Sequence, residues 1–326
     1  LRTMFLFSSG LMLFFMLSGA LRSAGDAKTP MILGMTMTVL NIIFNIVLIS
    51  GLGPIPSFGV KGSAMGTCLA AGVIAVYSIC KLWNGSWVIS IHSKGGYAPD
   101  LSVIRKLFQF GLPAGIQGIA MNIGGFFMLS YVGSLAQSAA AQAAYAVCYS
   151  QLFAFVAFAS TGLMGATSAI VGQNLGAKNV ERANEAVHVA ARFGLIGSAV
   201  LGIFYFFFPG FLLGIFGMTE PTAVEIGVEL LRFLSISGIF VSVALTYTGG
   251  LQGTGDTKSP LFISIISQVL IPLGICFVIQ NTIGLEPWHI WTAILVGHIT
   301  RCLLSVLRFS QGKWRNIKVD IETTVG

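Results

Sequence analysis

Residues 19–30 of the 326-residue chain read GALRSAGDAKTP, and residues 249–260 read GGLQGTGDTKSP. The two stretches share Gly, Leu, Gly, Asp, Lys and Pro at a constant offset of 230. Each stretch stands between two long apolar runs. Gly supplies a positive φ, a short acidic side chain accepts local N–H bonds, and Pro is tolerated in the first turn of a helix. The sequence therefore predicts one helix–turn–helix unit that occurs twice.

The composition indicates where these helices lie. Hydrophobic residues make up 55% of the chain and charged residues 9%, whereas a soluble domain carries about a quarter charged residues. This excludes a cytosolic enzyme, a disordered chain and a collagen-like repeat. The formal net charge is +7, but the basic residues are dispersed between apolar runs, so no nucleic-acid partner is expected. The five cysteines have no C-x-x-C spacing, and we expect neither a disulfide framework nor a metal site.

Nine apolar stretches are about long enough to cross a bilayer, for which about 20 residues are needed. With no water to satisfy free backbone groups, each should be an α-helix. We predict an all-α integral membrane protein with nine transmembrane helices, at residues 3–21, 31–50, 62–82, 107–132, 140–171, 190–208, 231–252, 261–280 and 288–307.

The basic residues predict the orientation of these helices. If successive spans alternate in direction, all of the 18 basic residues except Arg2, Lys61 and Arg232 lie on the same side as the C-terminus. The positive-inside rule makes that side cytoplasmic. We therefore expect a multi-pass protein of the cell inner (cytoplasmic) membrane with a cytoplasmic C-terminus.

The spacing of the repeat predicts its symmetry. Six spans separate the two copies, so both cross the membrane in the same direction, as parallel repeats do. The simplest parent has twelve helices in two lobes of six, the first three of which lie outside this chain. The predicted parts are the last three helices of an N-lobe (1–82), a cytoplasmic inter-lobe linker (83–105), a six-helix C-lobe (106–310) and a cytoplasmic tail (311–326).

Four motifs resemble the multidrug and toxic compound extrusion (MATE) family: the repeated GD-x-K-x-P turn, NIIFN at 41–45, FGLPAGIQ at 110–117 and VGQNLGAKNVERA at 171–183. The resemblance implies a two-lobed secondary transporter that exports organic, often cationic, drugs or metabolites in exchange for Na⁺ or H⁺ by alternating access. It implies no enzymatic activity and no cofactor besides the coupling ion. The expected partners are the lipid bilayer and an organic small molecule, and the expected state is a monomer.

By the same resemblance, Asn41, Asn45 and Thr67 are the candidate cation-coupling residues. In the family's N-lobe site an Asp stands at the position of Asn45. An amide can ligate Na⁺ but cannot exchange a proton near neutral pH. The alternatives are hydrogen bonds between helices for the two amides, and a bond from Thr67 back to its own helix. The C-lobe positions at which some members have acidic residues are here Met121 and Val241.

Amides, phenols and methionine at membrane depth suit a cavity for bulky, mostly apolar solutes. The candidates for its lining are Gln117, Met121, Asn122, Gln142, Tyr145, Tyr149, Tyr247 and Gln268. Ordinary helix packing is the alternative. His298 and Arg301, one turn apart, are compatible with a proton relay, but an arginine extending toward the cytoplasmic headgroups is the preferred interpretation. The candidate hinge residues are Gly25, Asp26, Pro30, Gly255, Asp256 and Pro260.

Two other functions are weighed against export. A flippase for lipid-linked precursors, in the same superfamily, would need a cationic cavity for a pyrophosphate, to which only His298 and Arg301 could contribute. An integral-membrane enzyme would need clustered catalytic side chains, and neither His92 nor His188 has such neighbours in the sequence.

Overall fold

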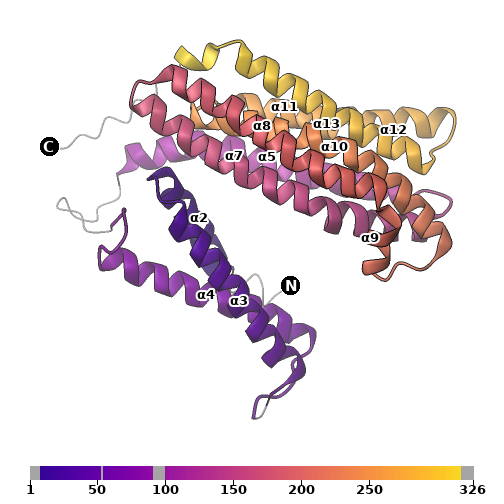
Figure 1. Cartoon of the computed structure of the whole chain (residues 1–326), viewed down its shortest axis with the longest axis horizontal. Helices are drawn as coiled ribbons and strands as arrows, with labels where there is room; N and C mark the ends of the chain where they lie inside the picture. The colour runs from indigo at the N-terminus through magenta and orange to yellow at the C-terminus, as the bar shows by residue number, and fades with distance from the viewer. Residues whose placement is uncertain (1–7, 53, 91–99, 317–326) are drawn as a thin grey trace. The chain divides into compact units, whose positions relative to one another are not determined.

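The computed structural model describes residues 8–52, 54–90 and 100–316 of the chain. Within these ranges all regular structure is helical, apart from an isolated bridge between Leu52 and Ile55. The chain divides into an N-terminal unit, Leu1–Ala98, and a C-terminal unit, Pro99–Gly326. Each unit has its own packed helices (Figure 1).

Three helices form the N-terminal unit: α2 (Ser9–Ser23), α3 (Lys28–Ser50) and α4 (Val60–Trp83). Both α2 and α3 pack against α4. Glycines allow the α3–α4 contact, because a Cβ atom at Gly62 would contact the Leu48 carbonyl of α3. Small residues of this kind drive helix association where lipid provides no hydrophobic force.

The C-terminal unit is larger, and its most buried helix is α10 (Pro221–Gly253), which packs against α7, α8 and α13. A Cβ at Gly249 would contact the Met164 carbonyl of α7, and one at Gly253 would lie 2.5 Å from the Ser168 carbonyl. The elements of this unit are α5 (Leu101–Gly133), α6 (Ser138–Tyr145), η1 (Ala146–Leu152), α7 (Phe153–Gly176), α8 (Val180–Phe207), α9 (Pro209–Ile215), α10, α11 (Lys258–Ile265), η2 (Ile266–Leu270), α12 (Ile271–Thr282), α13 (Pro287–Ser310) and η3 (Lys313–Asn316).

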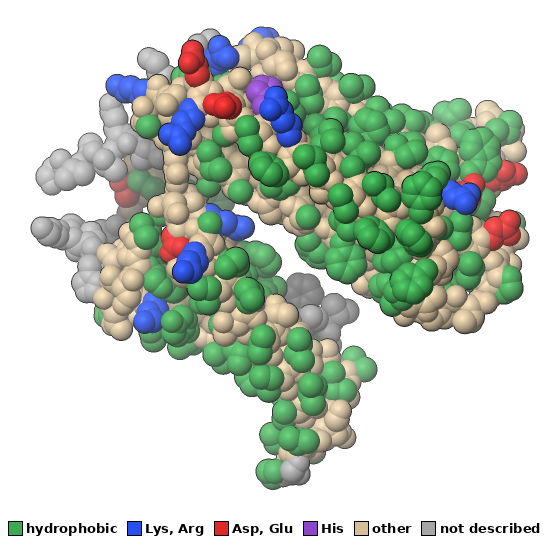
Figure 2. All heavy atoms as spheres, in the orientation of Figure 1, with side chains coloured by type: hydrophobic (Ala, Val, Ile, Leu, Met, Phe, Trp, Pro, Cys, Tyr) green, Lys and Arg blue, Asp and Glu red, His purple; other side chains and the backbone are tan. Residues whose placement is uncertain are grey.

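Eight of the predicted spans coincide with helices, or with helices continued through a π-helical segment, that are long and apolar enough to cross a membrane. The first predicted span, 3–21, coincides with the shorter α2 from Ser9 onward, and residues 3–7 lie outside the described residues. Figure 2 shows hydrophobic side chains along the helices of the C-terminal unit, with charged side chains gathered at their two ends. An exterior of this kind suits lipid.

The boundary between the units falls within the predicted linker, but the linker is shorter than predicted. Residues 101–105 belong to α5, which begins at Leu101 because the Asp100 carboxylate caps it by accepting from the N–H groups of Ser102 and Val103. Of the predicted tail, Lys313–Asn316 form the short helix η3, and residues 317–326 lie outside the described residues.

The two copies of the repeated turn have the same local structure. Gly25 and Gly255 adopt φ values of 93° and 87°. Asp26 N–H donates to the Leu21 carbonyl at 2.9 Å, and Asp256 N–H donates to the Leu251 carbonyl at 3.0 Å. The Oδ1 atom of each aspartate accepts the N–H of the residue three positions later, at 2.9 Å in the first copy and 3.0 Å in the second. The glycine and aspartate thus do at both turns what the sequence predicts, and a hinge motion there stays a prediction.

Candidate functional site

Asn41, Asn45 and Thr67 lie together between α3 and α4 of the N-terminal unit. Asn45 Nδ2 donates to Asn41 Oδ1 at 3.2 Å, and Asn41 Nδ2 donates to Thr67 Oγ1 at 3.0 Å. The Thr67 hydroxyl in turn donates to the Ser63 carbonyl at 3.2 Å. All three side chains are half-buried. The sequence therefore predicted a real cluster, which we name the amide cluster.

The amide cluster has one buried acceptor without a partner. Asn45 Oδ1 is enclosed and accepts no hydrogen bond from the described residues. It faces Gly66, where a Cβ atom would contact it, so the small residue makes room for the amide. Amide and hydroxyl oxygens are ligands for hard cations, but none of the three side chains carries an exchangeable proton. The cluster can therefore help coordinate a cation, and it also forms the hydrogen bonds that the alternative interpretation expects.

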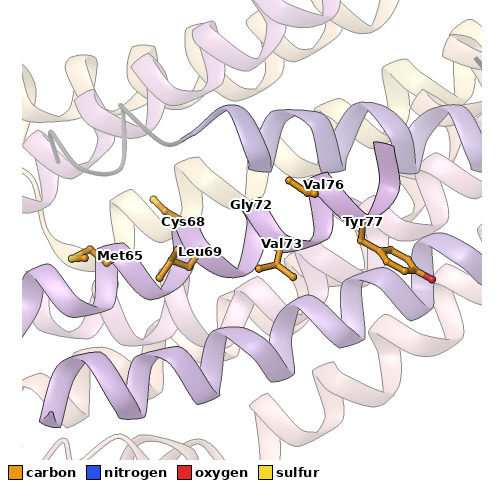
Figure 3. A pocket seen from close by; sticks show the side chains of 7 residues that line it. All are labelled: Met65, Cys68, Leu69, Gly72, Val73, Val76 and Tyr77. Carbon is orange, nitrogen blue, oxygen red and sulfur yellow. The ribbon is translucent and has the colours of Figure 1, made fainter. Parts of the chain in front are cut away.

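A separate apolar hollow of about 650 Å³ runs along one face of α4 (Figure 3). The spacing of its lining residues by three and four positions places them on one side of the helix. Its lining is hydrophobic except at the Tyr77 hydroxyl, and it offers no group for coupling or charge recognition: the residues are Met65, Cys68, Leu69, Gly72, Val73, Val76 and Tyr77.

The C-terminal unit contains a second cavity of about 650 Å³, the C-terminal cavity, which is partly open and has a mixed lining. Two π-helical segments contribute to it: η1 provides Tyr149 and Ser150, and η2 provides Gln268. Short π-helical turns are rare and frequently occur at functional sites. The remaining lining residues are Ala114, Gln117, Gly118, Met121, Phe153, Ala154, Ala157, Thr161, Met164, Val241, Leu245, Gln252, His298 and Arg301.

Aromatic rings cover one side of the C-terminal cavity. Tyr145 stacks on Tyr149 with ring centroids 4.9 Å apart, and Tyr149 stacks on Phe153 at 5.5 Å. Phe153 then stacks on the imidazole of His298 at 5.8 Å. A smaller cavity of about 140 Å³ shares Tyr149 and His298 and extends to Tyr145. The stack thus joins η1 to α13.

The predicted lining residues divide into two groups. Gln117, Met121, Tyr149 and Gln268 line the C-terminal cavity, and Tyr145 lines the smaller one. Gln117 is held by a hydrogen bond from its Nε2 to Ser264 Oγ at 2.6 Å.

Three predicted lining residues lie elsewhere. Asn122 is exposed and donates to the Gly118 carbonyl of its own helix at 2.8 Å, and Gln142 is also exposed. The Tyr247 hydroxyl bonds His188 Nδ1 at 2.9 Å on the other side of α10, in a cluster with Phe309. Spacing along one helix places a side chain on a face, but only the neighbouring helices decide what covers that face.

The preferred interpretation of Arg301 was wrong. Its side chain does not reach outward toward headgroups: the residue is 4% exposed and lines the C-terminal cavity together with His298, which is 3% exposed. Gln252 and Thr161 also line the cavity and were missed. For Arg301 and His298 the signal was present, since charged or titratable residues within a span usually face the interior of a bundle. Met121 and Val241, where the resemblance places acidic residues in some members, both line the cavity, and no described lining residue is Asp or Glu.

Comparison with known proteins gives concordant results. A family model described as MatE matches residues 113–278. The chain is 28% identical over 310 residues to a Thermotoga maritima protein named "Probable multidrug resistance protein NorM", covering 94% of this chain and 65% of the relative. It is 26% identical over 311 residues to "Multidrug export protein MepA" of Staphylococcus aureus, again covering 94% of this chain and 65% of the relative. The chain thus spans 65% of the length of these relatives.

Two solved structures have a similar fold. One is described as MATE in complex with MaL6, with a TM-score of 0.82, 20% identity and coverage of 91% of this chain and 66% of that chain. The other is described as the outward-facing conformation of a multidrug resistance MATE family transporter, with a TM-score of 0.82, 20% identity and coverage of 91% and 65%.

Proposed function

The chain belongs to the MatE family, and from this premise we propose that it acts as a secondary active efflux transporter, which exchanges Na⁺ or H⁺ for organic drugs or metabolites by alternating access. The observation that carries the proposal is the C-terminal cavity, whose 650 Å³ lie within the 300–1,000 Å³ typical of small-molecule sites. Aromatic and thioether groups alternate there with amides, which suits solutes that need few fixed hydrogen bonds.

The architecture and location belong to the same proposal. Helices α2, α3 and α4 act as the last three helices of an N-lobe, and α5 to α13 form the six-span C-lobe. The repeated turn supports this assignment, because it joins α2 to α3 and α10 to α11 with the same backbone conformation. The protein lies in the inner membrane as a monomer, with its C-terminus in the cytoplasm.

The amide cluster is proposed to assist ion coupling. Asn45 Oδ1, which accepts no hydrogen bond from the described residues, and the Thr67 hydroxyl oxygen provide ligands for a cation. Since amides do not titrate near neutral pH, the cluster's contribution is coordination and not proton carriage. No cofactor takes part besides the coupling ion.

Transport by purified protein in proteoliposomes tests the proposal. A fluorescent organic substrate should accumulate against its gradient when an inward or outward Na⁺ or H⁺ gradient of the correct direction is imposed. Flux that ignores both gradients would reject exchange.

The role of the amide cluster is tested separately. The double variant Asn41→Leu/Asn45→Leu should abolish the response to the gradient. The matched control is Asn281→Leu, because Asn281 is exposed and donates only to the Phe277 carbonyl of its own helix. If the double variant remains as coupled as the control, the cluster only joins α3 to α4.

One observation favours a second candidate function, a flippase for lipid-linked precursors. Arg301 and His298 both line the C-terminal cavity, as a pyrophosphate-binding site would require. Such a protein would move a polyprenyl pyrophosphate between leaflets. An integral-membrane enzyme has no comparable support: no group of three or more His, Cys, Asp or Glu that could hold a metal occurs in the part of the chain that the structure describes.

A further inference from the structure

Arg301 of α13 is a buried cation that has no anionic partner among the described residues. Its residue is 4% exposed, and its Nε atom is enclosed without a hydrogen-bond partner. Within the described residues the structure gives its guanidinium no hydrogen bond or ion pair, and its electrostatic neighbours are the phenol of Tyr149 and the imidazole of His298. A buried charge without a partner is costly. Its place in the lining of the C-terminal cavity indicates that a ligand supplies the missing anion.

The other unsatisfied groups of the C-terminal cavity favour the same kind of ligand. Gln268 Nε2 and His298 Nδ1 are also buried, and neither has a hydrogen-bond partner in the part of the chain that the structure describes. A guanidinium and an amide nitrogen only donate, and an imidazole nitrogen donates when it carries the proton. Together with the absence of Asp and Glu from the described lining, these groups favour a ligand rich in acceptor atoms.

Most of the remaining lining of the C-terminal cavity is apolar, and Gln117, Ser150, Thr161 and Gln252 are its other polar residues. The Phe153 and Tyr149 rings and the Met121 and Met164 side chains face a space of about 650 Å³. That volume exceeds what a simple inorganic anion fills, and it accommodates a drug-sized molecule. A ligand that satisfies both parts of the lining has an anionic group at one end and an aromatic or aliphatic body.

We propose that the C-terminal cavity binds amphiphilic organic anions, with a carboxylate or a similar oxyanion at Arg301 and the apolar body against the Tyr149–Phe153 ring stack. A guanidinium is suited to this role, since its planar set of donors matches the two oxygens of a carboxylate. The inference rests on the proposed function and names its substrate class, which is opposite in charge to the organic cations implied by the family resemblance.

Two dyes of matched shape and opposite charge test the proposal in the wild-type protein. Fluorescein and tetramethylrhodamine methyl ester share a xanthene skeleton, but the first is an anion and the second a cation. Fluorescence polarisation with detergent-solubilised protein should give a Kd for fluorescein at least about 10-fold below that of the rhodamine ester. Tighter binding of the rhodamine ester would overturn the proposal without any variant.

Substitutions at Arg301 test whether its guanidinium binds the anionic group of the ligand. Arg301→Gln should raise the Kd of fluorescein by about 10-fold or more, the loss expected for a charge-assisted contact of 1.5–3 kcal/mol, whereas Arg301→Lys should raise it by less than about 3-fold. The control is Arg232→Gln, because Arg232 is exposed on α10 and lies over the Phe206 ring. An Arg301→Gln variant that binds fluorescein as tightly as the control would refute the role of Arg301.

A third probe distinguishes a soluble amphiphilic anion from a lipid-linked pyrophosphate as the ligand of the C-terminal cavity. If farnesyl pyrophosphate binds more tightly than fluorescein and loses its affinity in Arg301→Gln, the cavity takes a lipid-linked pyrophosphate and the present proposal fails. The proposed function has a different readout. If the protein binds fluorescein but shows no gradient-driven flux, ion exchange is refuted and anion binding still holds. If it transports only the rhodamine ester, with coupling to the gradient, anion binding is refuted and ion exchange still holds.

Discussion

The C-terminal copy of the repeated turn carries an ion pair whose loss should destabilise the C-terminal unit by a measurable amount. Arg308 Nε and Nη2 donate to Asp256 Oδ2 at 3.1 and 2.8 Å. The same oxygen accepts the Ser259 hydroxyl at 2.7 Å. The pair ties the turn between α10 and α11 to the last turn of α13. We predict that Arg308→Gln weakens this attachment.

The burial of the two partners sets the magnitude. Asp256 is 7% exposed, whereas the Arg308 side chain is 28% exposed. Removing one partner of a fully buried pair costs about 3–5 kcal/mol, and a surface pair is worth about 0.2–1 kcal/mol. Ser259 continues to satisfy the carboxylate, so we expect an intermediate loss of about 2 kcal/mol. At about 2–4 °C per kcal/mol for a domain of 150–250 residues, Tm should fall by about 4–8 °C.

Buried thiols provide the assay. Cys148, Cys276 and Cys302 are buried in the C-terminal unit, while Cys68 and Cys80 belong to the N-terminal unit. In a Cys68→Ala/Cys80→Ser background, a thiol-reactive dye that fluoresces on coupling reports only the unfolding of the C-terminal unit. Its thermal midpoint in detergent is the quantity to compare.

A matched variant and a double-mutant cycle complete the test. Arg105→Gln removes an exposed arginine of α5 and should change Tm by less than about 1 °C. Asp256→Asn combined with Arg308→Gln should cost less than the sum of the two single variants, because the second change finds the contact already lost. Additive losses, or an Arg308→Gln variant as stable as the Arg105→Gln control, would refute the reasoning.

Three further predictions use the same assay. Gly249→Ala should lose about 1–3 kcal/mol, since its Cβ would contact the Met164 carbonyl and push α10 away from α7; Gly197→Ala, with no atom near its Cβ, should be neutral or stabilising, and equal effects would contradict the packing argument. Gly255→Ala should lose about 1–2 kcal/mol because φ is 87° there, and a variant as stable as wild type would show that the turn relaxes freely. Burial raises the pKa of Asp256, but its hydrogen bonds with Ser259 and Arg308 outweigh this effect and hold the pKa below the ordinary 3.8. The contribution of Asp256 to stability is therefore complete above pH 3.8 and is lost as pH falls through the lower folded pKa. The Tm difference between wild type and Asp256→Asn should shrink in strong acid, and a constant difference would contradict the pKa direction.

The helical fold could be predicted from the sequence because a bilayer leaves a long apolar segment few other structures. The ends of the helices could not be predicted from apolarity alone. Helix α10 begins at Pro221, well before the predicted 231, because the Glu220 carboxylate caps it by accepting from the Thr222 and Ala223 N–H groups. Capping residues act outside the apolar window, so a hydropathy criterion does not register them.

The site was predictable where one helix face or one known motif was sufficient. Asn41 and Asn45 share a face of α3, and the structure brings Thr67 of α4 onto that face. The burial of Arg301 depends on α5, η1, α10 and η2 closing around α13, and no local pattern contains that information. The same limitation explains the wrong placement of Tyr247 in the cavity lining. Its helix is buried on several sides, and its hydroxyl bonds His188 and does not reach the cavity.

The π-helical geometry of η1 and η2 has a consequence for how the cavity can be altered. The hydrogen-bonded ring between residues five apart contains one more residue than the α-helical ring between residues four apart. Deleting a single codon within Ala146–Leu152 would therefore convert the bulge into regular α-helix while α6 and α7 keep their packing registers. The wall that carries Tyr149 would flatten, yet the surrounding bundle would remain assembled. Deletion of one residue normally disrupts the packing of a membrane helix, but within η1 or η2 it would change which solutes fit the cavity.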